Sequence, residues 1–115
     1  ILLCEDEDAV REFIQRGLEL AGHRVTATAD GAGATEAVGA AGYDLMITDV
    51  SLPDIDGVAL AQRLRQRQPE LRVAIITGYA EERERIEALD QPVAAMLIKP
   101  FSLADLRARV AEALG

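Results

Sequence analysis

The chain has 115 residues, enough for one domain with a buried core but too few for separate substrate and cofactor domains. Half of its residues are hydrophobic and 28% are charged, as in globular proteins, and no apolar run approaches the roughly 20 residues of a membrane helix. The net charge of −8 does not favour the basic face that nucleic-acid binding needs. Because no secretory leader is visible, we expect one cytoplasmic domain over residues 1–115, with no membrane or nucleic-acid contact.

Two details of the composition bear on chemistry. Cys4 is the only cysteine, which excludes an internal disulfide and a cysteine-rich zinc site, and we expect it to be a small buried residue on a strand. Lys99 is the only lysine among 12 basic residues. Since lysine offers a compact ammonium and arginine a planar fork, this position either requires an ammonium or reflects chance in an arginine-rich chain.

Apolar runs and amphipathic segments alternate along the whole chain. In chain order they predict strand Ile1–Cys4, helix Ala9–Ala21, strand Val25–Thr28, helix Ala34–Ala41, strand Leu45–Thr48, helix Val58–Gln68, strand Val73–Thr77, helix Glu81–Leu89, strand Ala95–Ile98 and helix Leu103–Leu114. At least four of the five strands are continuous apolar runs, which is typical of parallel strands covered on both faces. The pattern therefore predicts a doubly wound α/β domain.

Carboxylate, hydroxyl and ammonium side chains lie at the carboxyl ends of four of the predicted strands. Glu5 and Asp6 follow the first, Asp49 the third, Thr77 ends the fourth, and Lys99 follows the fifth. In an open parallel sheet the functional crevice lies beyond these strand ends, so the five side chains are expected to converge there. Taken singly, each has a simpler explanation, such as acids favouring a helix N-terminus, a turn-forming aspartate or a solvated lysine.

A cluster of three carboxylates needs cations. Two carboxylates about 4 Å apart repel by ~4 kcal/mol at an effective dielectric near 20. Oxygen ligands without histidine or cysteine suit Mg²⁺, Lys99 could add a second positive charge, and Thr77 could donate a hydroxyl. This combination of carboxylates, ammonium and hydroxyl suits phosphoryl transfer. Asp49 is the best candidate nucleophile because it lies at the centre of the expected row of strand ends.

The pattern resembles the receiver domains of two-component response regulators. Four motifs in order carry the resemblance: Ile1–Glu7, Thr48–Gly57, Ile75–Gly78 and Ile98–Phe101. It covers the whole chain and implies a single (βα)5 flavodoxin-like, CheY-like domain, with a parallel five-stranded sheet of order 2-1-3-4-5.

The resemblance also implies a set of roles. Asp49 would be the phosphoacceptor, and Glu5, Asp6, Asp49 and a main-chain carbonyl of Ser51 would hold Mg²⁺. Thr77 and Lys99 would bind phosphoryl oxygens, and the Lys99–Pro100 peptide would be cis.

Such a domain is a regulatory phosphoacceptor rather than an enzyme, although it carries intrinsic Mg²⁺-dependent self-phosphorylation and self-dephosphorylation chemistry. The implied donor is a histidine kinase, a histidine phosphotransfer protein or a small phosphodonor. Phosphorylation would change binding to a downstream protein, an output domain or a second copy of the chain, through a surface that includes the segment Glu81–Leu89.

Three positions depart from the family pattern. Glu5 stands where the family often has the shorter aspartate, and Met96 stands where an aromatic residue is common. Tyr79 is either a substitute for that aromatic residue or a packing residue. The segment Leu89–Val93 lacks the pattern found in regulators with winged-helix outputs, which slightly favours a stand-alone regulator.

Rival functions fit less well. The motif Asp54–Gly57 resembles that of haloacid-dehalogenase-type phosphatases, but it follows a loop and lacks the expected hydroxyl. Flavin binding lacks a hydroxyl-rich phosphate loop and aromatic residues to enclose the ring. The alternative that stays open is a pseudo-receiver, a protein-binding module that keeps the fold without phosphorylation.

Overall fold

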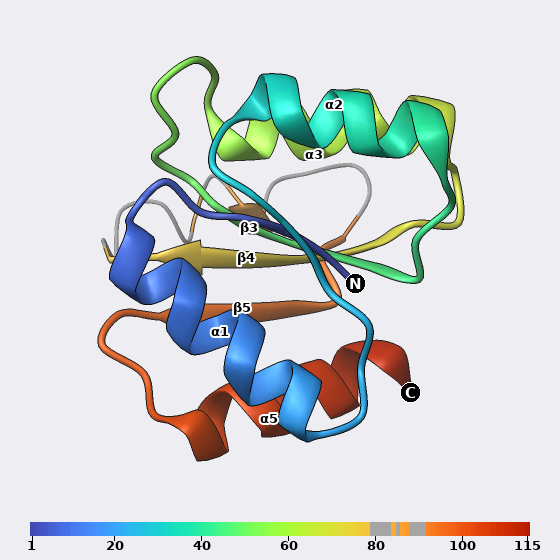
Figure 1. Cartoon of the computed structure of the whole chain (residues 1–115). Helices are drawn as coiled ribbons and strands as arrows, with labels where there is room; N and C mark the ends of the chain where they lie inside the picture. Colours follow the sequence, from blue (N-terminus) through green and yellow to red (C-terminus); the bar gives the residue numbers. More distant parts are fainter. Residues whose placement is uncertain (79–83, 85, 88–91) are drawn as a thin grey trace.

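The computed structural model describes residues 1–78, 84, 86, 87 and 92–115, and within them five strands form one parallel sheet (Figure 1). The strands are β1 Leu2–Cys4, β2 Thr26–Thr28, β3 Leu45–Asp49, β4 Arg72–Thr77 and β5 Ala95–Ile98. Their spatial order is β2-β1-β3-β4-β5, and every neighbouring pair is parallel. The predicted fold class and sheet order are therefore confirmed.

Four complete helices lie in the described part of the chain and cover both faces of the sheet. They are α1 Asp8–Leu20, α2 Gly31–Ala40, α3 Gly57–Arg67 and α5 Leu103–Leu114. Figure 1 shows α2 and α3 on one face and α1 and α5 on the other. None of the described helices is long and apolar enough to cross a membrane.

Part of the predicted helix Glu81–Leu89 lies outside the described residues, as do Tyr79 and residues 89–91. Within that segment the structure describes Glu84, Ile86 and Glu87, all of which are helical.

The sheet separates two hydrophobic cores. Successive residues of a strand point to opposite faces, so Leu2 and Cys4 pack with α2 and α3 while Leu3 packs with α1 and α5. In β4, Ile75 faces the first core and Ile76 the second, and both are fully buried. Burial on both faces explains why these strands are continuous apolar runs in the sequence.

Helix α2 begins at Gly31, three residues before the predicted start, because two carboxylates cap it. Asp30 Oδ1 accepts a hydrogen bond from the Gly33 amide at 2.8 Å. Asp54, from the loop after β3, accepts from the amides of Gly31 at 2.9 Å and Ala32 at 3.0 Å. These bonds satisfy amide donors that a helix N-terminus leaves without intrahelical partners.

The topology fixes where a functional site can form. From β1 the chain passes to β2 on one side of the sheet and then returns to β3 on the other side of β1. The chain leaves the carboxyl end of β1 toward β2 and leaves the carboxyl end of β3 in the opposite direction, toward β4, so a crevice opens between these two strand ends. Glu5 directly follows β1 and Asp49 is the last residue of β3, which places both at this crevice.

Candidate functional site

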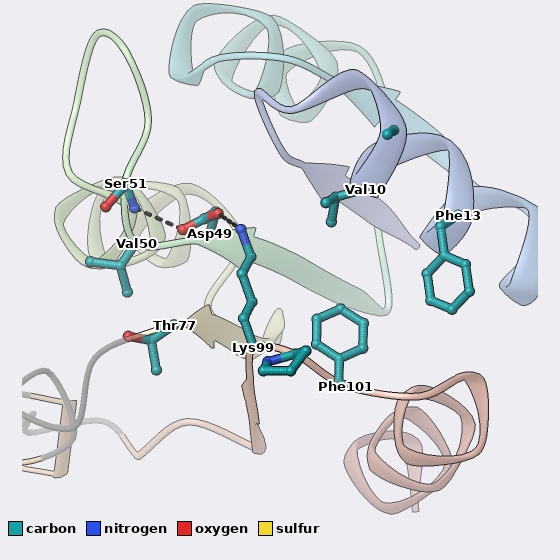
Figure 2. Close-up of a pocket in the computed structure, with 11 residues that line it drawn as sticks. Val10, Phe13, Asp49, Val50, Ser51, Thr77, Lys99 and Phe101 are labelled. Carbon is teal, nitrogen blue, oxygen red and sulfur yellow. Dashed lines mark hydrogen bonds and ion pairs between the residues drawn. The ribbon is translucent and has the colours of Figure 1, made fainter.

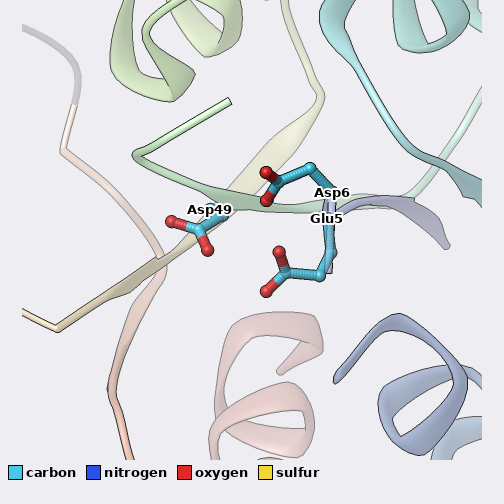
Figure 3. Close-up of side chains that lie close together, drawn as sticks. All are labelled: Glu5, Asp6 and Asp49. Carbon is cyan, nitrogen blue, oxygen red and sulfur yellow. The ribbon is translucent and has the colours of Figure 1, made fainter. Parts of the chain in front are cut away.

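Three carboxylates meet at the carboxyl ends of β1 and β3 (Figure 3). One oxygen each of Glu5, Asp6 and Asp49 can be chosen so that all three lie within 4.8 Å of one another. Glu5 is fully buried and Asp49 is 6% exposed, whereas Asp6 is exposed to solvent. The convergence expected from the strand ends is therefore present, with two buried acids and one at the surface.

The Lys99 ammonium lies against this cluster, as Figure 2 shows for its contact with Asp49. Lys99 Nζ donates a hydrogen bond to Asp49 Oδ2 at 2.6 Å. The same nitrogen lies 3.1 Å from Glu5 Oε1 in an ionic contact whose geometry is not that of a hydrogen bond. The expected cis peptide between Lys99 and Pro100 is present.

Burial and charge shift two pKa values at this site. Burial raises the pKa of Glu5 to about 7, and the Asp49 charge adds to the effect, while the Glu7 amide and the Lys99 ammonium oppose it. For Lys99 burial alone would lower the pKa, but the contacts with Asp49 and Glu5 outweigh burial and raise it. Lys99 is therefore a permanent cation at neutral pH, and the acids compete for a single ammonium.

The second Asp49 oxygen is held by the loop that follows it. The Ser51 amide donates to Asp49 Oδ1 at 2.9 Å, so each carboxylate oxygen of Asp49 has a defined partner. The loop returns at Gly57, whose amide donates to the Val50 carbonyl at 2.7 Å. A Cβ at Gly57 would lie 1.9 Å from the Asp49 carbonyl oxygen, so only glycine allows α3 to begin this close to Asp49.

Thr77 ends β4 and is 3% exposed. It belongs with Asp49 and Lys99 to the lining of a pocket of about 700 Å³ (Figure 2). Opposite these polar groups the pocket is lined by apolar side chains, including Val10, Phe13 and Phe101. Phe13 is 43% exposed, and the centroid of its ring lies 6.4 Å from that of Phe101 at this pocket.

The donor set fits a hard divalent cation. Its protein ligands are carboxylate oxygens, which Mg²⁺ and Ca²⁺ prefer. Glu5 Oε1 is buried and has no hydrogen-bond partner among the described residues. The Lys99 ammonium, 3.1 Å away, offsets part of the cost of burying this oxygen, and a divalent cation at the cluster would offset more of it.

All five side chains predicted from the strand ends thus lie at one edge of the sheet. Other residues that shape the site were not predicted. Arg11 donates to the Glu5 carbonyl, Gly57 packs on the Asp49 backbone, and Asp54 ties the loop after Asp49 to α2. The sequence signal was present only for Asp54 and Gly57, which lie in the quoted motif Thr48–Gly57.

The fold and site together define a small doubly wound α/β domain with a charged crevice at the carboxyl ends of its strands, and sequence comparison identifies its family. The family described as "Response regulator receiver domain" matches residues 1–111, so the chain belongs to this family.

Relatives place the family in different proteins. The chain is 38% identical to the response regulator receiver protein CpdR of Brucella abortus, covering 92% of this chain and 88% of CpdR. It is 38% identical to the transcriptional activator protein PfeR of Pseudomonas aeruginosa, covering 95% of this chain but only 35% of PfeR. The chain also resembles the crystal structure of the receiver domain from hybrid histidine kinase CckA, with a TM-score of 0.84 and 35% sequence identity. The match covers 99% of this chain and 97% of that chain.

Proposed function

We propose that this receiver domain accepts a phosphoryl group on Asp49 and thereby acts as a switch in a two-component phosphorelay. One observation carries the proposal: the Asp49 carboxylate lines a pocket, lies close to two further acids and contacts the ammonium of Lys99. A nucleophilic carboxylate needs this setting, because charge must be neutralised on the transferred group.

Glu5, Asp6 and Asp49, with the main-chain carbonyl of Ser51, are the proposed ligands of Mg²⁺. When bound, Mg²⁺ supplies positive charge that offsets the carboxylates and the phosphoryl oxygens. Asp6 is the exposed member of the set, whereas Glu5 is buried against Lys99. We therefore expect Asp6 to contribute more of the binding than Glu5.

The proposed transfer is a single displacement. An Asp49 carboxylate oxygen forms a bond to phosphorus, and the bond between phosphorus and the donor's imidazole nitrogen or acyl oxygen breaks. The leaving group keeps the electron pair of that bond. Lys99 and Thr77, which share the pocket with Asp49, bind the phosphoryl oxygens. Later attack of water on phosphorus returns free Asp49 and inorganic phosphate.

The proposed donor is a histidine kinase or a histidine phosphotransfer protein, and the proposed output is altered binding to a downstream protein or domain. The relatives differ in how much of their length this domain occupies. The chain spans most of CpdR but about a third of PfeR, so this domain occurs both nearly alone and joined to other segments. The cytoplasmic location stays a prediction.

Beryllium fluoride, which imitates a phosphoryl group, tests the proposal without a kinase. We expect Mg²⁺ and beryllium fluoride together to shift the amide NMR signals of Ser51, Thr77 and Lys99. Asp49→Asn should abolish these shifts. Asp44→Asn is the matched control, because Asp44 precedes β3 at the opposite end from Asp49. If Mg²⁺ and beryllium fluoride left the wild-type spectrum unchanged, the domain would be a phosphorylation-independent protein-binding module.

A further inference from the structure

Arg11, in the first turn of α1, holds the backbone of the acidic turn that follows β1. Its Nη1 donates a hydrogen bond to the Glu5 carbonyl oxygen at 3.0 Å. Its Nη2 lies 2.6 Å from Asp8 Oδ1. The Arg11 side chain is 24% exposed, whereas the Asp8 side chain is 91% exposed. The ion pair is therefore screened by water, and the bond to the carbonyl is the more protected of the two contacts.

The position of this carbonyl matters because it belongs to the peptide unit that joins Glu5 to Asp6. Holding the plane of that peptide limits rotation about ψ of Glu5 and φ of Asp6, and so restricts the directions in which both side chains leave the backbone. A second bond, from the Glu7 amide to Glu5 Oε2 at 3.2 Å, holds the Glu5 carboxylate within the same turn. Arg11 thus acts on two carboxylates of the cluster without contacting either.

We propose that Arg11 is a positioning residue for Mg²⁺ binding, acting through the peptide between Glu5 and Asp6. The inference rests on the proposed function, since it assigns Arg11 a role in the same site. Groups that orient metal ligands typically contribute about 10- to 100-fold to metal affinity. Loss of the Arg11 guanidinium should therefore weaken Mg²⁺ binding although the carboxylates themselves remain.

The sign of the effect separates positioning from simple electrostatics. Arg11 is a cation close to the acidic turn, so removing its charge makes the site more negative and should tighten the binding of a divalent cation. Positioning predicts the opposite result. The two explanations therefore cannot account for the same measurement.

The experiment measures Mg²⁺ binding to the full chain directly, from the shifts of amide NMR signals in a Mg²⁺ titration. It also follows phosphorylation by acetyl phosphate over the same Mg²⁺ range by intact mass, and the half-maximal Mg²⁺ concentrations of the two readouts should change together. For Arg11→Ala we expect the Mg²⁺ concentration at half-maximal rate to rise about tenfold, with the rate at saturating Mg²⁺ nearly unchanged. Arg11→Lys keeps the charge but not the fork, and should fall between Arg11→Ala and the wild type.

Arg16→Ala is the matched control. It removes an arginine from the same helix, but Arg16 is 76% exposed and its charged partner is Glu12, 3.6 Å away. We expect its half-maximal Mg²⁺ concentration to equal that of the wild type. Circular dichroism at the assay temperature verifies that each variant is folded. If Arg11→Ala does not fold, Arg11→Lys carries the test.

A half-maximal concentration that stayed the same or fell in the folded Arg11 variants would overturn the positioning role while leaving the proposed function intact. A lower maximal rate with an unchanged half-maximal concentration would also overturn it. A wild-type rate independent of Mg²⁺ would overturn the inference and the proposed Mg²⁺ ligands, but not Asp49 as the phosphoacceptor. The absence of any phosphoryl adduct in the wild type would overturn the proposed function itself.

Discussion

Lys99 Nζ lies 2.6 Å from Oδ2 of Asp49, joining the end of β5 to the end of β3 across the intervening strand β4. The contact places the chain's only lysine on its proposed phosphoacceptor. Removing one partner of such a largely buried pair leaves the other charge uncompensated. The proposed cation for the phosphoryl group is therefore already beside Asp49 before a donor arrives.

Lys99→Ala should slow phosphorylation of Asp49 by about 100-fold, the size expected for loss of one group that stabilises developing negative charge. Lys99→Arg should not restore the rate, because a planar fork replaces the compact ammonium. Initial rates of adduct formation with acetyl phosphate at saturating Mg²⁺ measure the effect. Unchanged rates in Lys99→Ala would show that Lys99 serves only to neutralise the resting acids.

Gly57→Ala should destabilise the fold, because its Cβ would lie 1.9 Å from the Asp49 carbonyl oxygen and 3.0 Å from the Val50 Cα. Backbone displacement of this kind typically costs about 1–3 kcal/mol. Gly39→Ala is the control, since Gly39 is an exposed α2 residue with open space around its Cα. It should stabilise the protein by about 0.5–1 kcal/mol. Urea unfolding of both variants measures the difference, and equal effects would contradict this account.

Asp54→Ala should lower the melting temperature at pH 7, because α2 loses the acceptor for two of its first amides. The hydrogen bond from the Gly31 amide lowers the pKa of Asp54 most, burial opposes it, and the Ala32 amide adds to the lowering. Because the folded-state pKa lies below the ordinary 3.8, the stabilisation is present above pH 3.8 and is lost as the pH falls through the lowered value.

The difference in melting temperature between wild type and Asp54→Ala should therefore shrink below pH 3.8. Glu70→Ala is a suitable control, because Glu70 is exposed and no side-chain hydrogen bond or ion pair joins it to the described residues. A difference for Asp54→Ala that persisted unchanged in acid would mean that the carboxylate charge does not support the cap.

Periodicity was enough to predict the layers, and the strand-end residues were enough to predict the meeting of Glu5 and Asp49. The sheet order was predicted only from the resemblance to receiver domains. Both acids lie at the carboxyl ends of apolar runs, so they meet in any parallel sheet in which β1 and β3 are neighbours. Helix α2 begins three residues earlier than predicted. Its N-cap Asp30 is local, but its second capping residue, Asp54, comes from a loop 23 residues beyond Gly31. Local patterns carry no signal for such a partner.

The support around the acids could not be predicted for the same reason. In the sequence, Arg11 has the position of an ordinary solvated residue on an amphipathic helix. Only the folded turn brings its guanidinium to the Glu5 carbonyl. Helical spacing puts Phe13 on the same side of α1 as Ile14 and Leu18, but only Ile14 and Leu18 are buried in the core, whereas Phe13 lines the pocket. Spacing defines a helix face, and packing decides where that face ends.

Phosphorylation of Asp49 can be measured by comparing the intact mass of the wild type and Asp49→Asn after incubation with acetyl phosphate, each with and without Mg²⁺. If Asp49 carries the phosphoryl group, one phosphoryl adduct, sensitive to hydroxylamine, should form only in the wild type with Mg²⁺. An adduct of equal yield in Asp49→Asn, or none in the wild type with Mg²⁺, would contradict this prediction.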